Sequence, residues 1–366
     1  MTDEVSVQTL QDWLAQGKPV TVLDVRPMEE RATWWIPGSQ HVNAYASLKA
    51  GSPGPLADVI LPDGQPVVTV CGAGRVSTQA AEMLAQRGIP ALSLAGGMKA
   101  WSLAWNTAAC SLGAVEITQV RRTGKGCLSY LICSEGEAAV IDASVDPGVY
   151  LSLAEQSGAQ IRYVLDTHVH ADHISRSRLL AEKSGTELLL PRLNHVRYPH
   201  KPVGEGDSLP LGSASIEVLE TPGHTAESVA YLIQSVGIFT GDTLFLAGVG
   251  RPDLDANQTE AGVRARILFR SLTRLASLDP RLLLFPGHTS EPVPFDGHPL
   301  TASLGEVVNR LSSWLVSEVE FVTRILARIP PTPPNYSVIS RINELGDWPE
   351  GDLTDLEAGA NRCAVS

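Results

Sequence analysis

The stretch IRYVLDTHVHADH, residues 161–173, decides how the rest of the chain is interpreted. It begins as an apolar, β-branched run, which is typical of a buried strand. It then presents four potential metal ligands within six residues: His168, His170, Asp172 and His173. An extended chain points residues i and i+2 to the same side, whereas a helix needs a spacing of three or four. The pattern therefore predicts ligands gathered at the carboxyl end of a strand, where open α/β sheets place their chemistry.

The ligand types narrow the kind of site. Imidazole and carboxylate groups together suit Zn, Fe, Mn or Ni, and no cysteine in the stretch favours a structural zinc site. The alternative is an exposed polar loop whose histidines contact only water. So dense a group of ligands directly after a strand favours a metal site over that loop.

Length and composition bound the class of protein. With 366 residues the chain is expected to form two domains, and its 43% hydrophobic and 19% charged residues are ordinary for a globular protein. A net charge of −12 argues against nucleic acid and anionic membranes as partners. The N-terminal segment MTDEVSVQTL is acidic without an apolar core, no apolar run is as long as a membrane span, and the five cysteines are scattered. We therefore expect a cytoplasmic protein without a disulfide framework.

Residues 1–110 are predicted to form a first domain, a small parallel α/β unit. Short apolar runs alternate in this segment with stretches whose apolar residues recur at helical spacing. The expected strands cover residues 20–24, 67–70 and 91–94, and the expected helices cover residues 78–86 and 98–105.

The chemical feature of this domain is the loop Cys71-Gly-Ala-Gly-Arg-Val-Ser77, which connects a strand to a helix. Gly72 and Gly74 allow backbone N–H groups to turn inward and form a cradle for an anion. The helix adds its positive N-terminal end, which Ser77 or Thr78 is expected to cap. A cysteine at the entrance of such a loop is predicted to react as a thiolate. The alternative is a structural cysteine beside a tight turn.

The whole segment resembles the rhodanese (sulfurtransferase) family. The matching features are Asp24-Val25-Arg26, Glu29 or Glu30, Ile36-Pro37-Gly38-Ser39, and Cys71 at the persulfide-carrying position. The resemblance implies that Cys71 carries sulfane sulfur. The substrate-binding residues that it implies are Gly72, Gly74 and Arg75.

Two positions depart from the rhodanese pattern. Trp34-Trp35 stands where the family commonly has Gly-His. Val76 occupies the usual place of an arginine, and Arg75 lies one position earlier.

Residues 111–330 are predicted to form a second domain built on sheets. The expected strands cover residues 112–117, 127–133 and 138–142, and a helix follows at residues 150–156. We interpret Cys127 and Cys133 as small core residues of the second strand, not as ligands. Three later strands each stop at a potential ligand, and these ligands are His224, Asp242 and His288.

These motifs resemble the metallo-β-lactamase superfamily. HisValHisAlaAspHis, ThrProGlyHisThr, GlyAspThr and ProGlyHis follow one another over residues 168–288 in the order of that superfamily. The implied fold is a four-layer αββα sandwich. The predicted fold class is therefore a rhodanese-like parallel α/β domain followed by a metallo-β-lactamase sandwich. The superfamily hosts several chemistries, so the fold alone does not decide the function.

The dinuclear hydrolases of this superfamily, such as glyoxalase II, imply two Zn or Fe ions. The ligands of the first ion would be His168, His170, His224 and Asp242. Those of the second would be Asp172, His173, Asp242 and His288. A metal-bridged hydroxide would then attack a thioester or ester.

Residues 241–254, GDTLFLAGVGRPDL, resemble more closely the persulfide dioxygenases, the mononuclear iron branch. That resemblance implies one Fe(II) per chain with open positions for O₂ and substrate. Its implied ligands are His168, His224 and Asp242. Arg251 falls where that family binds the substrate carboxylate. The groups that orient the ligands through hydrogen bonds would be His170, Asp172, His173 and His288.

The predicted function follows from both resemblances. The metal domain would oxidise a low-molecular-weight thiol persulfide, such as glutathione persulfide, with O₂ and water to sulfite and free thiol. Cys71 would donate or accept sulfane sulfur, with sulfite or thiosulfate as small-molecule partners. Ser290 stands where glutathione-specific members have tyrosine, so another thiol carrier also fits. The alternatives are the dinuclear thioester hydrolase and, for the first domain, a non-catalytic binding module; a homo-oligomer is compatible with the sequence.

Residues 331–366 are predicted to be a proline-rich connector and tail. ProThrProProAsnTyr favours an extended connector, and the small-residue end of the chain carries Cys363. The favoured interpretation is a docked or frayed end. The alternative is a tail that returns over the active site and brings Cys363 to a persulfide.

Overall fold

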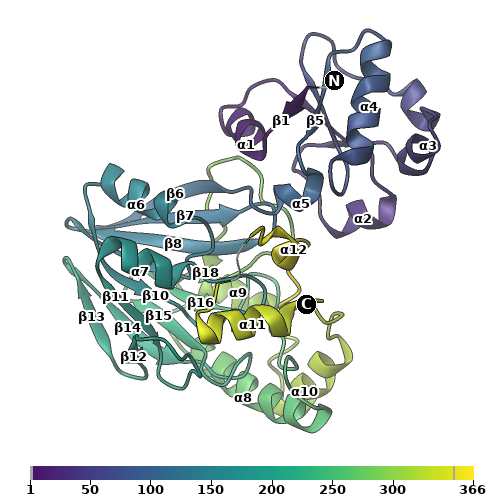
Figure 1. Cartoon of the computed structure of the whole chain (residues 1–366). Coiled ribbons are helices and arrows are strands. Elements are labelled where there is room, and N and C mark those ends of the chain that lie inside the picture. Colours follow the sequence, from purple (N-terminus) through teal and green to yellow (C-terminus); the bar gives the residue numbers. More distant parts are fainter. Residues whose placement is uncertain (1–2, 349–350) are drawn as a thin grey trace.

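The N-terminal part of the molecule is a five-stranded parallel sheet flanked by helices (Figure 1). The computed structural model describes residues 3–348 and 351–366. The strands, in sheet order, are β1 (Glu4–Val5), β5 (Ala91–Leu94), β4 (Val67–Val70), β2 (Thr21–Asp24) and β3 (Gln40–His41). The helices are α1 (Val7–Ala15), α2 (Met28–Thr33), α3 (Tyr45–Lys49), the 3₁₀ helix η1 (Gly54–Asp58), α4 (Arg75–Gln86) and α5 (Gly97–Trp101).

This sheet is buried on both faces, as its continuous apolar strands predict. One face packs against α3 and α4 through Leu48, Ala80 and Leu84. The other face packs against α1 and α5 through Leu10 and Trp101. The predicted parallel α/β unit is confirmed.

The remainder of the chain forms two facing sheets. The seven-stranded sheet runs in the order β12 (Lys201–Val203), β11 (Glu187–Pro191), β10 (Gln160–Leu165), β9 (Glu137–Ile141), β8 (Cys127–Ser134), β7 (Val115–Arg122) and β6 (Asn106–Leu112). The six-stranded sheet runs in the order β13 (Ser208–Leu211), β14 (Ala214–Glu220), β15 (Val229–Ile233), β16 (Gly237–Gly241), β18 (Leu283–Pro286) and β19 (Ala302–Ser303). The boundary expected at residue 110 falls inside β6.

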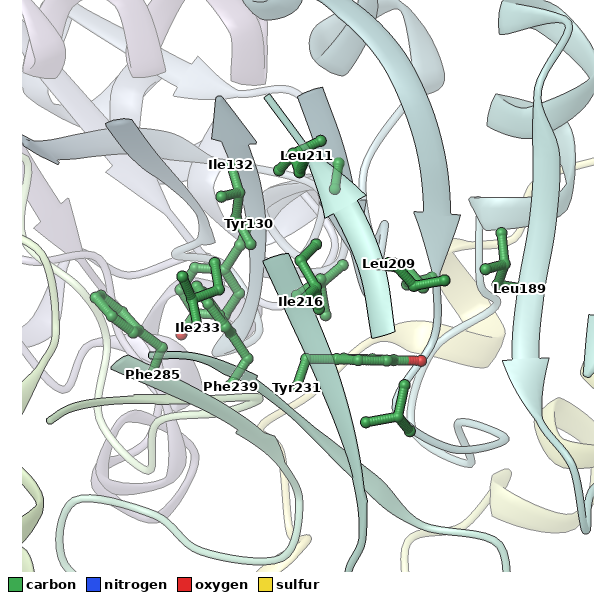
Figure 2. Close-up of a cluster of buried hydrophobic side chains, with 14 of the residues drawn as sticks. Tyr130, Ile132, Leu189, Leu209, Leu211, Ile216, Tyr231, Ile233, Phe239 and Phe285 are labelled. Carbon is green, nitrogen blue, oxygen red and sulfur yellow. The ribbon is translucent and has the colours of Figure 1, made fainter. Parts of the chain in front are cut away.

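The largest core lies between these two sheets (Figure 2). Tyr130 of β8 packs edge-on against Phe239 of β16 at a ring-centroid distance of 4.9 Å, and Phe239 stacks on Phe285 of β18. On the outside, α6 (Pro147–Gln156) and α7 (Ser177–Ser184) cover the seven-stranded sheet. Helices α8 (Gln258–Ala276), α9 (Leu304–Arg310) and α10 (Glu318–Ala327) cover the six-stranded sheet. The predicted αββα sandwich is therefore confirmed.

The C-terminal segment is folded onto the sandwich. It contains α11 (Tyr336–Leu345), α12 (Thr354–Glu357) and the short strand β20 (Ala364–Val365), which pairs antiparallel with β17 (Val249–Gly250). We refer to residues 351–366 as the C-terminal arm. Among the described residues, no helix combines the length and the apolar character needed to cross a membrane.

Candidate metal centre

Strand ends bring the predicted ligands together at one edge of the sandwich. The stretch His168–His173 follows β10 in one sheet. His224, Asp242 and His288 follow β14, β16 and β18 in the other sheet. A backbone hydrogen bond from Leu128 to Gly287 joins the two sheets beside them, with a distance of 2.8 Å. Because the two sheets contribute to the same edge, ligands that are up to 120 residues apart in the chain become neighbours.

His168, His224 and Asp242 form the first cluster. The Nε2 atoms of His168 and His224 lie 3.9 and 3.7 Å from Oδ2 of Asp242. Two atoms that each bind one ion at about 2.1 Å are at most about 4.2 Å apart, so these distances fit a shared metal. His168 Nε2 and Asp242 Oδ2 are buried and have no hydrogen-bond partner. Buried polar atoms without partners are costly, and a metal ion would satisfy them.

The imidazoles of the first cluster are held with their Nε2 atoms inward. His224 Nδ1 contacts the backbone oxygen of Arg251 at 2.8 Å, and His168 Nδ1 contacts the hydroxyl of Thr167 at 2.9 Å. Such contacts fix the tautomer and leave Nε2 free to bind a metal. Burial lowers the pKa of His168 to about 3, so this imidazole is neutral, as a ligand must be.

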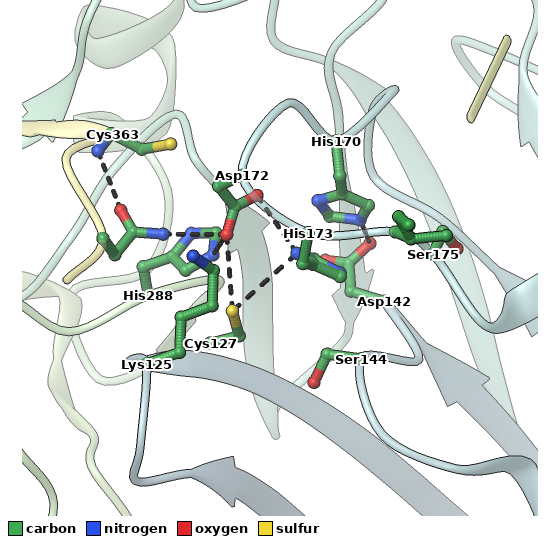
Figure 3. Close-up of polar contacts among 12 residues, drawn as sticks. Lys125, Cys127, Asp142, Ser144, His170, Asp172, His173, Ser175, His288 and Cys363 are labelled. Atoms are coloured by element: carbon green, nitrogen blue, oxygen red, sulfur yellow. Dashed lines mark hydrogen bonds and ion pairs between the residues drawn. The ribbon is translucent and has the colours of Figure 1, made fainter. Parts of the chain in front are cut away.

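Cys127, Asp172, His173 and His288 form the second cluster (Figure 3). Asp172 Oδ2 lies 2.8 Å from His288 Nε2, 3.3 Å from Cys127 Sγ and 2.9 Å from Asn361 Nδ2. Its other oxygen lies 3.0 Å from His173 Nδ1. The second cluster is thus internally hydrogen-bonded, and Asp172 accepts from four groups.

The neighbouring charges strengthen the hydrogen bonds within the second cluster. Burial lowers the pKa of His288, but Asp242 and Asp172 outweigh it and hold the value well above its usual range. Burial and Asp172 raise the pKa of the Cys127 thiol, yet His173 and His288 bring it down to about 7. Cys127 was expected to be a small core residue that is not a ligand. It is buried as expected, and its sulfur lies beside Asp172 and His173 of the second cluster. Cys133 packs in the core beneath α6, as expected.

His170 belongs to neither cluster and is fixed by a carboxylate that sequence reasoning missed. Its Nε2 atom lies 3.1 Å from Oδ1 of Asp142, which also accepts a hydrogen bond from the backbone N–H of Thr167 at 2.7 Å. Asp142 is therefore the residue that holds the ligand loop against β9. The sequence did contain a signal for this residue, because Asp142 ends a predicted strand just as Asp242 does.

Arg251 is not positioned as expected. Its side chain is fully buried, and all five of its N–H donors are used within the chain. Nε and Nη2 donate to the carboxylate of Asp253, and the remaining bonds go to the carbonyls of Pro330, Pro331 and Arg362. No donor remains for a substrate carboxylate, so in this conformation the side chain holds the C-terminal arm instead.

The arm itself enters the metal centre. Asn361 contacts Asp172, and Cys363 is buried with its sulfur within 4.8 Å of ligand atoms of Asp242 and His288. The structure thus favours the alternative in which the tail returns over the site. A short segment of small residues has no hydrophobic periodicity. The sequence therefore allowed this docking only as one of two alternatives.

A cavity of about 420 Å³ opens beside the metal centre. Its wall includes Phe245, Gly248, Ser290 and His288 of the second cluster. Ala364 and Ser366 of the arm form another part of the wall. No lysine or arginine occurs among the described residues that line it.

The Cys71 loop has the predicted strand-to-helix geometry, between β4 and α4. Gly74 has a φ of 92°, and a side chain at Gly97 would lie 2.3 Å from the Cys71 carbonyl, so both positions require glycine. Ser77 does not cap α4 as expected: its hydroxyl donates to the Gly74 carbonyl at 2.8 Å and lies 3.3 Å from Cys71 Sγ. Thr78 also donates to that carbonyl and does not cap the helix. Arg75 is exposed beside the loop.

Comparisons with known proteins agree with this geometry. Residues 122–288 match the model of the metallo-β-lactamase superfamily, and residues 6–104 match that of the rhodanese-like domain. The structure is similar to a metallo-β-lactamase from Staphylococcus aureus subsp. aureus COL (26% identity, TM-score 0.58, 64% of this chain and 74% of that one). It is also similar to ETHE1 from Myxococcus xanthus (28% identity, TM-score 0.52, 66% of this chain and 97% of that one).

Curated relatives are named hydroxyacylglutathione hydrolases. The protein from Anaeromyxobacter dehalogenans is 36% identical over 46% of this chain and 63% of its own length. The protein from Rhodospirillum rubrum is 37% identical over 42% of this chain and 57% of its own length. The chain therefore spans about three fifths of the length of these relatives.

The fold and the ligand clusters define a metallo-β-lactamase domain with a candidate metal centre. The N-terminal part of the chain is a rhodanese-like domain, so the chain is a fusion of these two domains.

Proposed function

We propose that the chain is a mononuclear iron persulfide dioxygenase with a fused sulfurtransferase domain. The observation that carries the proposal is the difference between the two clusters. In the first cluster, buried ligand atoms face one another without partners. In the second cluster, the carboxylate of Asp172 and both nitrogens of His288 are engaged in hydrogen bonds, and Nε2 of His173 is the one imidazole nitrogen without a partner among these described residues. One ion held by two histidines and a carboxylate is the ligand set of oxygen-activating non-haem iron.

The reaction proposed is RSSH + O₂ + H₂O → RSH + SO₃²⁻ + 2H⁺. Fe(II), when bound by His168, His224 and Asp242, would supply the activation of O₂ and a position for the persulfide sulfur. The cavity would hold the carrier thiol, and its apolar wall at Phe245 would exclude water. His288, which lines the cavity, would hold a proton between Asp172 and Asp242 that the departing thiolate can take.

The cavity lining also bears on the carrier. Glutathione has two carboxylates, and the described lining residues include no basic side chain to pair with them. Arg251, which would supply such a charge, is engaged by Asp253 and by the arm. A small persulfide without that double negative charge therefore fits this cavity better than glutathione persulfide.

Metal content and oxygen uptake test the proposal. Protein purified anaerobically is expected to contain about one iron per chain and to consume O₂ when a small alkyl persulfide is added. Slower uptake with glutathione persulfide would agree with a lining that has no lysine or arginine among the described residues. About two metals per chain, thioester cleavage and no oxygen uptake would overturn it in favour of the dinuclear hydrolase. That second candidate is favoured by the curated relatives named hydroxyacylglutathione hydrolases.

The role of the first domain is tested separately. Cys71→Ser is expected to abolish sulfur transfer from thiosulfate to cyanide, because Cys71 is the sulfur carrier in this proposal. Oxygen uptake with a preformed small persulfide should remain within about twofold of the parent protein, since the metal centre is intact. Sulfur transfer that survives in Cys71→Ser would make the first domain a binding module.

A further inference from the structure

The carboxylate of Asp172 is surrounded by donors, unlike that of Asp242. Its Oδ2 atom lies within hydrogen-bond distance of three donors: Nε2 of His288 at 2.8 Å, Nδ2 of Asn361 at 2.9 Å and Sγ of Cys127 at 3.3 Å. A carboxylate oxygen offers two lone pairs, so three donors leave none free for a cation. By contrast, Oδ2 of Asp242 has no hydrogen-bond partner among the described residues. Asp172 is therefore the residue at which a second ion would meet competition.

Two of these three donors could themselves bind an ion. His288 and Cys127 each offer a lone pair to a metal once the atom that faces Asp172 loses its proton. The amide nitrogen of Asn361 acts only as a donor, so it competes with an ion at Asp172 and cannot join Asp172 as a ligand. Asn361 is thus the one donor of the three that can only oppose a second ion.

The amide of Asn361 is held with its NH₂ group toward Asp172. Its Oδ1 atom accepts a hydrogen bond from the backbone N–H of Cys363 at 2.8 Å. The backbone N–H of Asn361 donates to the Lys125 carbonyl at 3.2 Å. Rotation of the amide to offer its oxygen to an ion would break the bond to Cys363 and leave that N–H without its acceptor, which costs free energy in a buried site.

The C-terminal arm is anchored on both sides of Asn361. Before Asn361, the completely buried carboxylate of Glu357 pairs with Arg122 at 2.9 Å and with Arg176 at 2.5 Å. After Asn361, strand β20 pairs antiparallel with β17. Because a buried and fully paired carboxylate is costly to withdraw, the amide stays at Asp172 for as long as the arm is docked.

We propose that Asn361 keeps a second metal ion out of the metal centre. It is a positioning residue that acts through Asp172, because it holds this carboxylate as a hydrogen-bond acceptor beside His288. Without Asn361, a lone pair of Asp172 would be available to a second ion together with Nε2 of His173, which has no partner among the described residues. The inference rests on the proposed function and deepens it. It gives the reason why a chain that retains every ligand of a dinuclear centre would hold one iron.

Removal of the amide tests the inference as a gain of metal. Metal-free, full-length protein is loaded anaerobically with excess Fe(II), freed of unbound iron by gel filtration and analysed for iron by mass spectrometry. The parent protein is expected to bind about one iron per chain, and Asn361→Ala about two. A residue with only a structural role would lower the iron content when it is removed, so a gain identifies exclusion. Asn309→Ala, at an exposed position of α9, is the matched control and should bind about one iron.

Asn361→Asp is a second variant of nearly the same size. It replaces the donor by a carboxylate that can bind an ion, so it should also take up about two irons per chain, with a higher affinity for the second iron than Asn361→Ala. About two irons in Asn361→Asp but about one in Asn361→Ala would mean that the new carboxylate creates a site of its own, which overturns the proposal.

The docking of the arm is followed in the same samples. Cys363 is 1% exposed, so its alkylation by iodoacetamide, read by peptide mass spectrometry, reports release of the arm. The rate in metal-free Asn361→Ala should stay within about twofold of the parent rate, because the anchors at Glu357 and β20 remain. Faster alkylation together with a second iron would assign the exclusion to the arm as a whole and overturn its assignment to Asn361.

The contrary results separate this inference from the proposed function. About one iron per chain in both the parent protein and Asn361→Ala would overturn the role of Asn361 without contradicting the proposed dioxygenase. About two irons per chain in the parent protein would contradict the mononuclear centre of the proposed function and, with it, any exclusion by Asn361.

Discussion

The two oxygens of Asp242 lie in different environments. Oδ2 faces His168 and His224 without a hydrogen-bond partner, whereas Oδ1 lies 2.5 Å from Nδ1 of His288. One carboxylate therefore belongs to the first cluster through one atom and to the second cluster through the other. Burial raises the pKa of Asp242, but the neighbouring histidines outweigh it and keep the pKa below its usual value, so the ligand is ionised.

Asp172 provides a test of the metal number. With one metal in the first cluster, Asp172→Asn should leave about one metal per chain and weaken metal affinity by about 10- to 100-fold, because Asp172 acts only through hydrogen bonds to His288 and its neighbours. Metal analysis by mass spectrometry checks this expectation. Asp242→Asn, which removes a ligand, is the matched variant and should lose the metal. A fall from two metals to one in Asp172→Asn would show that Asp172 binds a metal directly.

The C-terminal arm contacts the metal centre directly through Asn361. Asn343 of α11 precedes it and donates to the backbone carbonyls of His170 and His173 at 2.7 and 2.8 Å, so helix and arm together hold the ligand loop. The side chain of Arg251 also holds the arm, because it donates a hydrogen bond to the backbone carbonyl of Arg362. Helix α11 and the arm thus contact the ligand loop from residues that lie 170 or more positions away in the chain.

Arg251→Gln separates an arm-holding role from a substrate-binding role. Loss of the guanidinium removes hydrogen bonds from a charged donor, each worth about 1.5–3 kcal/mol, and should loosen the arm. We expect alkylation of Cys363 in the metal-free protein to accelerate at least about tenfold. The control is Arg281→Gln, an exposed side chain paired with Asp279. A raised KM with Cys363 alkylation unchanged would instead favour contact between Arg251 and substrate.

Glu357 makes the docking of the arm dependent on pH. Burial raises its pKa, but Arg122 and Arg176 outweigh burial and hold the pKa well below the usual value. A carboxyl group with a lowered pKa contributes its full stability above the unfolded value of about 4.3 and loses it as the pH falls towards the folded value. Protection of the arm from hydrogen exchange should therefore be constant from about pH 8 to 5 and decline below about pH 4.3.

Glu357→Gln is the control for that titration. It leaves two buried arginines without a charge partner, which costs about 3–5 kcal/mol. Hydrogen exchange of the arm should then be fast at neutral pH and lose the carboxyl-dependent step at low pH. An arm that stays protected in Glu357→Gln would show that β20 pairing alone holds it.

Trp34 of the first domain contacts the second domain directly. The indole N–H donates to the Thr123 carbonyl of the other domain at 3.0 Å, and a side chain at Gly126 would lie 3.0 Å from the indole ring. Lys99 of α5, which donates its backbone N–H to the Gly72 carbonyl of the cysteine loop, pairs with Asp355 of the arm at 2.6 Å. The arm therefore contacts both the rhodanese-like loop region and the metal centre.

Trp34→Ala tests how far the domains depend on each other. Removal of a buried tryptophan side chain lowers the free energy of unfolding by about 3–5 kcal/mol. Part of that loss here weakens the contact between the two domains. Differential scanning calorimetry is expected to resolve two unfolding transitions in Trp34→Ala where the parent protein shows one. Met28→Ala, at an exposed position of the neighbouring helix α2, should leave the single transition in place. A single transition in both variants would mean that other contacts couple the domains.

The sequence by itself predicted the features of this protein that depend on residues close together in the chain. The apolar run before His168 predicted β10, and the same pattern before Asp242 and His288 predicted ligands at strand ends. Apolar strand patterns and the polar residues that follow them are local features, so the sequence predicted that ligands stand at the ends of these strands. The glycines of the Cys71 loop were equally informative, because their backbone conformations exclude other residues.

Only the tertiary structure shows where the C-terminal arm docks, which groups the side chain of Arg251 contacts and which groups surround Cys127. Each depends on a partner far away in the chain: Asn361 on Asp172, Arg251 on Pro330, and Cys127 on His173. Such contacts form because packing of the two sheets places strand ends side by side, and no local periodicity encodes that proximity. The departure from the rhodanese pattern at Trp34 also has a physical reason in the second domain, because the indole N–H donates a hydrogen bond to a buried carbonyl there.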